Sequence, residues 1–189
     1  HMAEPTKGYV RIEHPCQQRV LGTLEFMCGM DFTNIHAGID GCAIPAFAIP
    51  LENIALALAR IATPDVLPAM RAKAVTRICD AIAAEPYMVA GRNRYCSEVM
   101  AITGKRVMVK TGAEGVFAAA IPDLGLGVAL KCDDGATRAS QAMMTAILIQ
   151  LGALEEGMTD LLGHLIRVPL KNCKGDEIGE IRPSGPLAF

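Results

Sequence analysis

Residues 106–132 read Arg106-Val-Met-Val-Lys-Thr-Gly-Ala-Glu-Gly-Val-Phe-Ala-Ala-Ala-Ile-Pro-Asp-Leu-Gly-Leu-Gly-Val-Ala-Leu-Lys-Cys132, and they say most about the fold of this chain. Three short apolar runs, 106–110, 115–121 and 126–132, lie within this stretch and are separated by Gly, Pro and Asp. Short apolar runs with turn residues between them are typical of β-strands. We therefore predict three consecutive strands, most simply an antiparallel meander.

Helical spacing of apolar residues dominates on both sides of this stretch. Upstream helices are expected from His14-Pro15 to before Gly29, from Pro50 to about Ile61, from Pro64 to about Glu85 and from Tyr95 to Ile102. Downstream we expect helices over Gly135–Leu151 and Glu156–Leu162, then one or two strands between Arg167 and Arg182, turned at Lys174-Gly175-Asp176. Segment 36–45 is broken by Gly and Pro and is predicted to be a loop. The pattern predicts an α+β fold, an antiparallel sheet backed by helices.

The bulk composition is that of a globular protein with a large core. Of the 189 residues, 51% are hydrophobic and 20% are charged, the net charge is -2, and no Trp is present. A single domain over 1–189 is expected, with residues 1–2 as a cloning scar. No basic patch, aromatic platform or long apolar stretch is visible, so neither nucleic acid nor a membrane is an expected partner.

The cysteines indicate a reducing environment. Seven are scattered along the chain without close pairs, which favours free thiols and a cytoplasmic protein. Nearly all lie among apolar neighbours and are predicted to be small buried hydrophobic residues, Cys96 included. Cys42 is the exception, because it lies in a polar Gly-containing loop.

The predicted strand that ends in Lys110-Thr111-Gly112 carries a motif found in the active sites of some serine hydrolases. Lys-Thr-Gly at a strand end is one signature of the penicillin-recognising serine hydrolases, beside Ser-x-x-Lys and Ser-Asp-Asn. Such an edge can offer backbone donors to an oxyanion, while the Lys cation attracts a carboxylate or lowers a neighbouring pKa. The Thr adds a hydroxyl and the Gly permits close approach. The same tripeptide is also common in ordinary turns, and that alternative remains open.

The partner motifs of such a hydrolase are not found in the sequence. The only serines are Ser97, Ser140 and Ser184, and none is followed by Lys three residues later. A hydroxyl without an adjacent base is a poor nucleophile. The sequence by itself therefore does not support a free-standing serine hydrolase.

Four blocks of the sequence can be taken together. They are Gly8-Tyr-Val-Arg11 with His14-Pro15, Asp40-Gly-Cys42-Ala-Ile-Pro45, Val109-Lys-Thr-Gly-Ala-Glu-Gly-Val-Phe117, and Lys131-Cys-Asp-Asp-Gly-Ala-Thr-Arg-Ala139. In this order they resemble the L-asparaginase II family of Rhizobium-etli-type enzymes. The resemblance implies a serine β-lactamase-like fold, hydrolysis of L-asparagine to aspartate and ammonia, and a homodimer.

The resemblance also implies roles for individual residues. Lys110 would be catalytic and pair with a serine, while Thr111, Gly112 and Asp40 would contact the substrate. Cys42 would be a zinc ligand, beside a Cys and a Lys of a Cys-Ser-Gly-Lys-His block. In the family that block and the Ser-x-x-Lys nucleophile precede the Gly-Tyr-Val-Arg segment, so the chain is expected to be the C-terminal portion of a longer hydrolase. The resemblance places Cys96 near the site.

Residue types alone give a weaker indication of metal. His36, Asp40 and Cys42 carry imidazole, carboxylate and thiol groups that suit zinc, but their spacing matches no standard zinc finger.

Two further hypotheses compete with an asparaginase. One is a non-catalytic association domain, or a subunit that completes another chain's site. For it the apolar excess predicts a homo-oligomer or a missing N-terminal segment that covers the surface. The other is a relative of the penicillin-recognising hydrolases.

Overall fold

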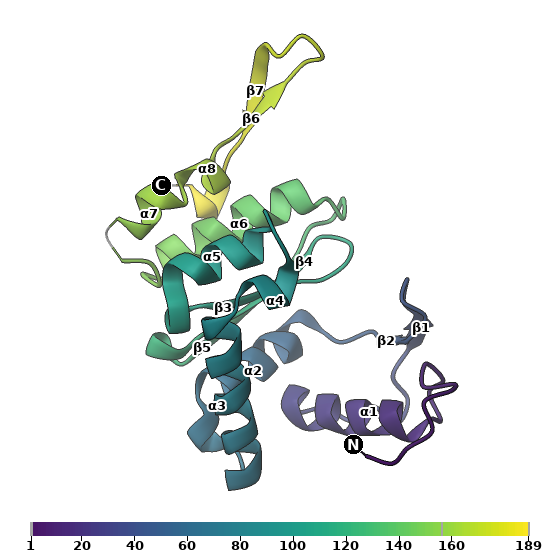
Figure 1. Ribbon diagram of the computed structural model, residues 1–189. Helices are drawn as coiled ribbons and strands as arrows, with labels where there is room; N and C mark the ends of the chain where they lie inside the picture. The colour runs from purple at the N-terminus through teal and green to yellow at the C-terminus, as the bar shows by residue number, and fades with distance from the viewer. Residues whose placement is uncertain (1, 156, 189) are drawn as a thin grey trace.

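The computed structural model describes residues 2–155 and 157–188 (Figure 1). His1 of the expected scar and Glu156, where a helix start was expected, lie outside these ranges. The predicted meander is confirmed: β3 (Met108–Thr111), β4 (Val116–Ile121) and β5 (Leu126–Lys131) form an antiparallel sheet in the order β3-β4-β5. Strand β3 is therefore an edge strand of this sheet.

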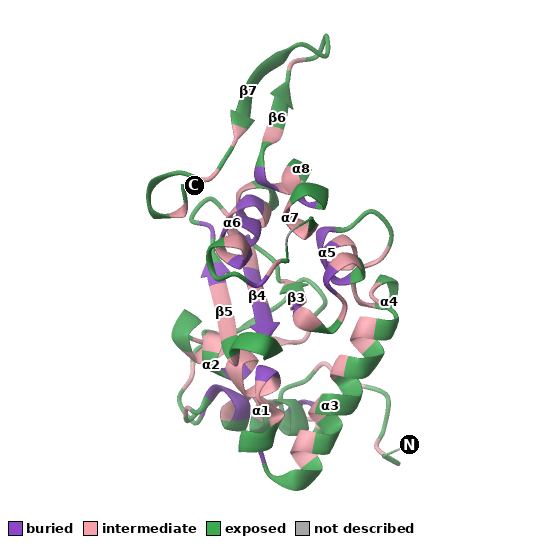
Figure 2. Cartoon of the chain, turned by 90° about the vertical axis from the view of Figure 1, so that its left-hand side faces the viewer, coloured by how far each residue is buried: buried purple, intermediate pink, exposed green. Residues whose placement is uncertain are grey.

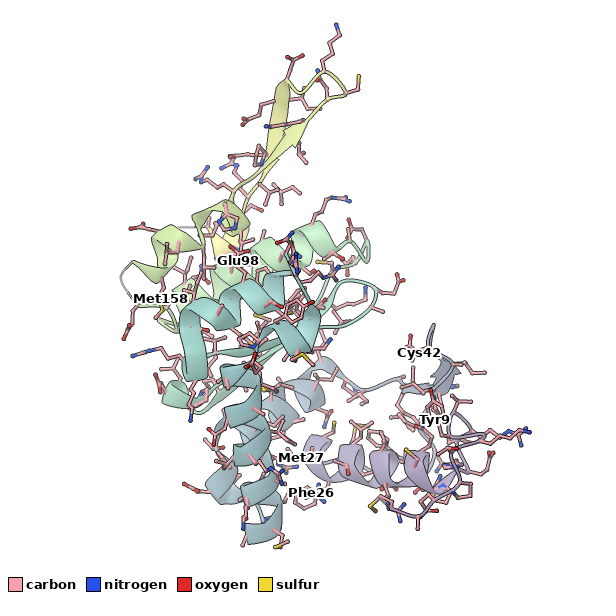
Figure 3. All side chains as sticks on the ribbon, viewed as in Figure 1. Tyr9, Phe26, Met27, Cys42, Glu98 and Met158 are labelled. Carbon is pink, nitrogen blue, oxygen red and sulfur yellow. The ribbon has the colours of Figure 1, made fainter. Side chains whose placement is uncertain are left out.

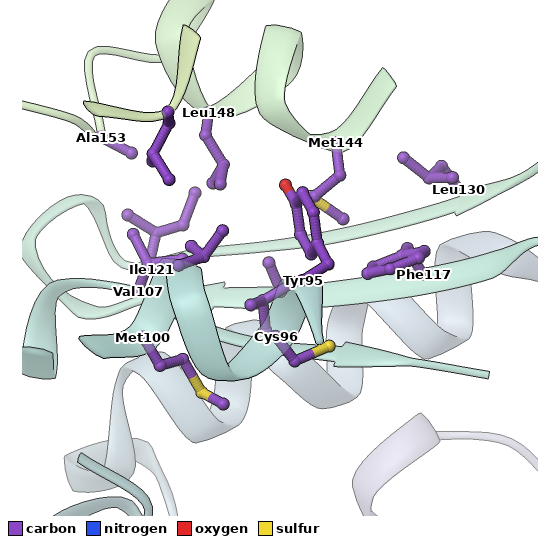
Figure 4. Packing of buried hydrophobic residues seen from close by; sticks show 14 residues of the cluster. Tyr95, Cys96, Met100, Val107, Phe117, Ile121, Leu130, Met144, Leu148 and Ala153 are labelled. Carbon is purple, nitrogen blue, oxygen red and sulfur yellow. The ribbon is translucent and has the colours of Figure 1, made fainter. Parts of the chain in front are cut away.

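Helices cover both faces of the sheet, which confirms the predicted α+β arrangement (Figure 1). Helix α2 (Leu51–Ala62) packs on β4 and β5 from one side, while α5 (Tyr95–Thr103) and α6 (Thr137–Gln150) lie on the other. The main core lies between the sheet, α5 and α6. In it the rings of Tyr95 and Phe117 meet edge to face, with centroids 5.1 Å apart (Figure 4). The Tyr95 hydroxyl reaches the Thr145 hydroxyl at 2.9 Å, so this buried polar group is satisfied.

The backbone of α2 lies directly against β5 at Gly127. A Cβ atom at this glycine would be 1.9 Å from the carbonyl oxygen of Ala55 and 2.3 Å from the amide nitrogen of Ala59. Real Cβ atoms do not approach backbone this closely, so only glycine fits here. The missing side chain thus sets the distance between helix and sheet.

Helix α1 (Pro15–Cys28) begins and ends as predicted. The His14 imidazole caps its first turn by accepting the Cys16 N–H at 3.1 Å, and Gly29 ends it in the left-handed conformation. Its last carbonyls are bound from α2, because the Arg60 guanidinium donates to the oxygen of Met27 at 3.0 Å and to that of Phe26. A second buried cluster lies between α1 and α2 and comprises Met27, Cys28, Phe32, Ala57 and Leu67.

A small hairpin occupies the segment predicted to be a loop, so that prediction was wrong. Strands β1 (Ala37–Ile39) and β2 (Pro45–Phe47) pair antiparallel. Asp40 closes the turn between them: its N–H donates to the Ile44 oxygen at 2.9 Å, and its carboxylate accepts the Gly41 N–H at 2.7 Å. The loop prediction rested on the polar residues and glycines of this segment, and these do not reveal the hydrogen bonds by which Asp40 closes the turn.

The third predicted helix is divided in two. A 3₁₀ turn, η1 (Pro64–Val66), precedes α3 (Ala69–Ala84), and Leu67 between them is extended, with φ -95° and ψ 156°. Pro68 explains the break, because a residue before proline is disfavoured in the helical region. The remaining short helices are α4 (Tyr87–Ala90), α7 (Met158–Leu161) and α8 (Gly163–Ile166), with 3₁₀ turns η2 (Gly104–Arg106), η3 (Pro122–Leu124) and η4 (Gly185–Leu187).

The C-terminal strands form the expected hairpin, β6 (Val168–Lys171) and β7 (Glu177–Ile181). It projects from the body, and most of its residues are exposed (Figures 1 and 2). Among the helices in the described ranges, none is long and apolar enough to cross a bilayer.

The seven cysteines are all free thiols in the structure. Cys28, Cys96 and Cys132 are buried as predicted. Cys16 and Cys173 are exposed, which corrects the expectation that they would be buried. Burial raises the pKa of the Cys28 thiol, although the nearby Arg60 cation opposes this shift.

Candidate active site

Lys110 lies near the end of edge strand β3, with its side chain exposed to solvent. Its ammonium nitrogen, Nζ, donates to the backbone oxygen of Thr111 at 2.6 Å. The N–H of Gly112 donates to the Val116 oxygen at 2.7 Å and therefore faces β4. Backbone groups of successive strand residues point to opposite sides, so those of Thr111 face the open edge. The strand thus presents an ammonium and backbone groups on one open edge.

Cys96 on α5 lies beside this open edge. The residue is 1% exposed, which confirms the prediction that it belongs to the core (Figure 4). Burial raises the pKa of its thiol, and the Thr111 N–H together with the Lys110 and Arg94 cations opposes that rise. The structure therefore brings Lys110, Thr111, Cys96 and Arg94 together. The resemblance had placed Cys96 near the site, whereas nothing in the spacing of the sequence indicated Arg94.

Gly112 has a packing role that the sequence did not reveal. A Cβ atom at this position would be 3.1 Å from the Cβ of Val116, on the strand that follows the turn. The glycine thus accommodates the tight return into β4. A role in substrate approach remains a prediction.

Two of the four sequence blocks that suggested the family lie against each other. The Cys132 N–H donates to the Gly115 oxygen at 3.1 Å. A Cβ at Gly115, whose φ is +71°, would be 2.9 Å from the Cβ of Cys132, and one at Gly135 would be 2.8 Å from a Glu114 carboxylate oxygen. The turn after β3 is therefore held against the loop that leads into α6.

The serines make structural contacts. Ser97 donates to the Gly91 oxygen at 2.7 Å and so closes the loop before α5. Ser140 is fully buried and donates to the Thr137 oxygen at 2.9 Å. Across residues 2–155 and 157–188, no serine hydroxyl is hydrogen-bonded to Lys110. The described residues thus contain a Lys of the predicted kind but no serine paired with it.

Cys42 and Asp40 lie together in the turn between β1 and β2, where the thiol is 3.6 Å from a carboxylate oxygen. Figure 1 shows this hairpin to one side of the three-stranded sheet, and Figure 3 labels Cys42 apart from α5, so the structure does not bring Cys42 to Lys110. Structural zinc sites take four ligands and catalytic ones three. No group of three or more His, Cys, Asp or Glu side chains suited to a metal occurs in the described ranges. The described residues therefore do not form a complete zinc site.

The fold and site define an α+β protein with a Lys-Thr-Gly edge strand packed beside two helices. A family model described as L-asparaginase II matches residues 1–183. The chain therefore belongs to the L-asparaginase II family, as its four sequence blocks predicted. None of the curated proteins compared with it matches the chain.

Proposed function

We propose that this chain forms part of an enzyme that hydrolyses L-asparagine to L-aspartate and ammonia. The observation that carries the proposal is the exposed Lys110 ammonium at the open edge of β3, in a chain of the L-asparaginase II family. Among the described residues, this ammonium forms no ion pair and donates only to Thr111. It is therefore available to a reacting group.

The proposed reaction has two steps. The lysine of the Ser-x-x-Lys motif takes the serine proton as the serine oxygen attacks the side-chain amide carbon of asparagine, and it returns that proton to the nitrogen as the C–N bond breaks and ammonia leaves. Water then hydrolyses the ester, which releases aspartate and restores the serine hydroxyl. Since no serine among the described residues pairs with Lys110, we propose that the Ser-x-x-Lys nucleophile is supplied by polypeptide outside residues 1–189.

Residues of this chain would prepare that step. The Lys110 cation would lower the pKa of a second serine, since a nearby positive charge favours an alkoxide. Thr111 would line the pocket with its hydroxyl and its edge-facing backbone groups, and Gly112 would leave room beside them. Asp40 lies in the β1–β2 turn to one side of the sheet (Figure 1), and it would contact the substrate only in a complete enzyme that brings this turn to the edge of β3.

Ammonia release from L-asparagine tests this proposal directly. We expect none above background from the 189-residue chain, because no serine among its described residues is paired with a lysine, and clear release from the natural gene product that contains it. Full turnover by the 189 residues alone would contradict the external nucleophile. No release from the natural product would contradict the asparaginase function itself.

We also propose that Cys42, with Asp40, contributes to zinc binding when further ligands are present. The thiolate and the carboxylate are both zinc ligands, but the described pair is too small a set to hold the ion firmly. No step of the reaction is assigned to the metal.

Zinc should slow the alkylation of Cys42. A thiolate bound to a metal is less available to iodoacetamide, so we expect Cys42 of the natural gene product to label more slowly with zinc present. Mass spectrometry of each labelled cysteine measures this effect. Cys16 and Cys173 are also exposed and serve as internal controls whose labelling zinc should leave unchanged. Equal protection of all three would indicate non-specific binding and contradict the assignment.

The association hypothesis retains a specific observation in its favour. Several large apolar side chains are strongly exposed, among them Ile39 and Met70 at 83% and Met88 at 78%. They lie on different elements and make no single patch, so homo-oligomerisation remains a prediction. The family assignment favours an asparaginase over a penicillin-recognising relative.

A further inference from the structure

A small hollow lies where α5 and α6 meet the open edge of β3. Its enclosed space is only about 10 Å³, about the room of one water molecule, and it opens to solvent. Its polar lining comes from three elements of the sheet-and-helix body and consists of Arg94, Thr111, Thr137 and Gln141, with Cys96. A space of this size can take up only a carboxylate oxygen or a similar small polar group, and the rest of a ligand would lie outside it.

The charge around the hollow is positive and has no acid opposite it. Arg94 lines the hollow, and Lys110 does not, although both cations oppose the rise in the pKa of the buried Cys96 thiol. None of the residues that line the hollow is Asp or Glu. In the described ranges, the side chains of Arg94 and Lys110 form no ion pair, whereas Arg19, Arg106 and Arg138 each contact a carboxylate.

The neighbouring neutral groups suit an anion too. The Arg94 guanidinium is a planar fork that matches the two oxygens of a carboxylate. The Thr137 hydroxyl and the Gln141 amide are one helical turn apart on α6 and can donate to the same ligand. Thr111 also lines the hollow, but its hydroxyl donates to the Gly112 oxygen at 3.1 Å, so its proton is not directed at a ligand.

We propose that Arg94 binds the α-carboxylate of the amino-acid substrate at this hollow. The inference rests on the proposed function for the identity of the ligand. Because the α-carboxylate is unchanged during amide hydrolysis, Arg94 would contribute equally to the ground state and the transition state. It is therefore a substrate-binding residue rather than a catalytic one.

The test compares two ligands that differ only at that carboxylate and that lack a side-chain amide to hydrolyse. L-aspartate carries the α-carboxylate, and L-isoasparagine carries a carboxamide in its place. Calorimetric titrations of both into the 189-residue chain should show L-aspartate binding at least about tenfold more tightly. Arg94→Gln should abolish this preference, and Arg94→Lys should retain part of it.

Arg92→Gln is the matched control, because Arg92 is an exposed arginine of the same loop that does not line the hollow. It should keep the wild-type preference. The inference is overturned if Arg94→Gln still prefers L-aspartate as the wild type does, or if the wild type binds the two ligands equally or not at all.

A kinetic comparison separates this inference from the proposed function. In the natural gene product, Arg94→Gln should raise KM about tenfold or more and leave kcat nearly unchanged, as expected for uniform binding. Ammonia release with an unaltered KM would keep the asparaginase function and overturn the role of Arg94. Arg94-dependent binding of L-aspartate without any ammonia release would support the role of Arg94 and overturn the asparaginase function.

Discussion

Replacing Lys110 with Met in the natural gene product is expected to lower kcat for L-asparagine hydrolysis about 10²- to 10⁴-fold, the range typical of a lost acid–base group. Methionine keeps the length of the side chain but removes the ammonium. Without that charge, the second serine of the proposed mechanism would keep an ordinary pKa and would give up its proton less readily during the reaction. Steady-state ammonia release measures the effect.

The fold should not change in this variant. Lys110 is exposed, and its one described hydrogen bond runs to a backbone oxygen of its own strand, so circular dichroism and the melting temperature should match the wild type. Lys105→Met is the matched control. Lys105 is also exposed and pairs with Asp80 at 2.5 Å, a surface contact worth about 1 kcal/mol or less. A similar loss of activity in both variants would contradict a specific role for Lys110.

Gly127→Ala is expected to have the largest effect on stability, a loss of about 4 kcal/mol or more. The new methyl group would meet the backbone of α2, at 1.9 Å from the Ala55 oxygen and 2.8 Å from the Leu58 carbonyl carbon. Backbone cannot rotate away as a side chain can, so the helix must separate from the sheet and lose buried contact. Urea unfolding followed by circular dichroism measures the change.

Gly179→Ala provides the comparison within another strand. Gly179 lies in β7, where the nearest atom to a new Cβ is the Leu170 side chain at 3.9 Å. Its stability should remain within about 0.5 kcal/mol of the wild type. If both substitutions lower the free energy of unfolding by the same amount, Gly127 is not required for the close approach of α2 to β5.

The sequence was sufficient for the sheet and most helices because their signals are local. The runs around Val109, Phe117 and Leu130 each end at turn residues, and helix α1 has a proline at its start and a glycine at its end. The β1–β2 hairpin was missed because its pairing depends on side-chain bonds of Asp40. The break at Pro68 was missed because the apolar spacing continues through it.

The candidate site was predicted less completely, and the reason is spatial. Lys110 and Thr111 were found because they belong to one short motif. Arg94 was not, since it comes from another element and only the packing of α5 beside β3 brings it to the same place. Gly127 falls within the predicted strand 126–132, but its contact with α2, far away in sequence, could not be inferred from the sequence.

The Arg60 contacts have a consequence for the order in which structure can form. The final carbonyls of α1 are bound by a side chain 33 and 34 residues further along the chain, and the ring of Phe26 lies near both Arg60 and Arg71. The C-terminal turn of α1 therefore acquires these partners only once α2 and α3 are in place. Native-state hydrogen exchange should consequently find this turn opening together with those helices, as one cooperative unit.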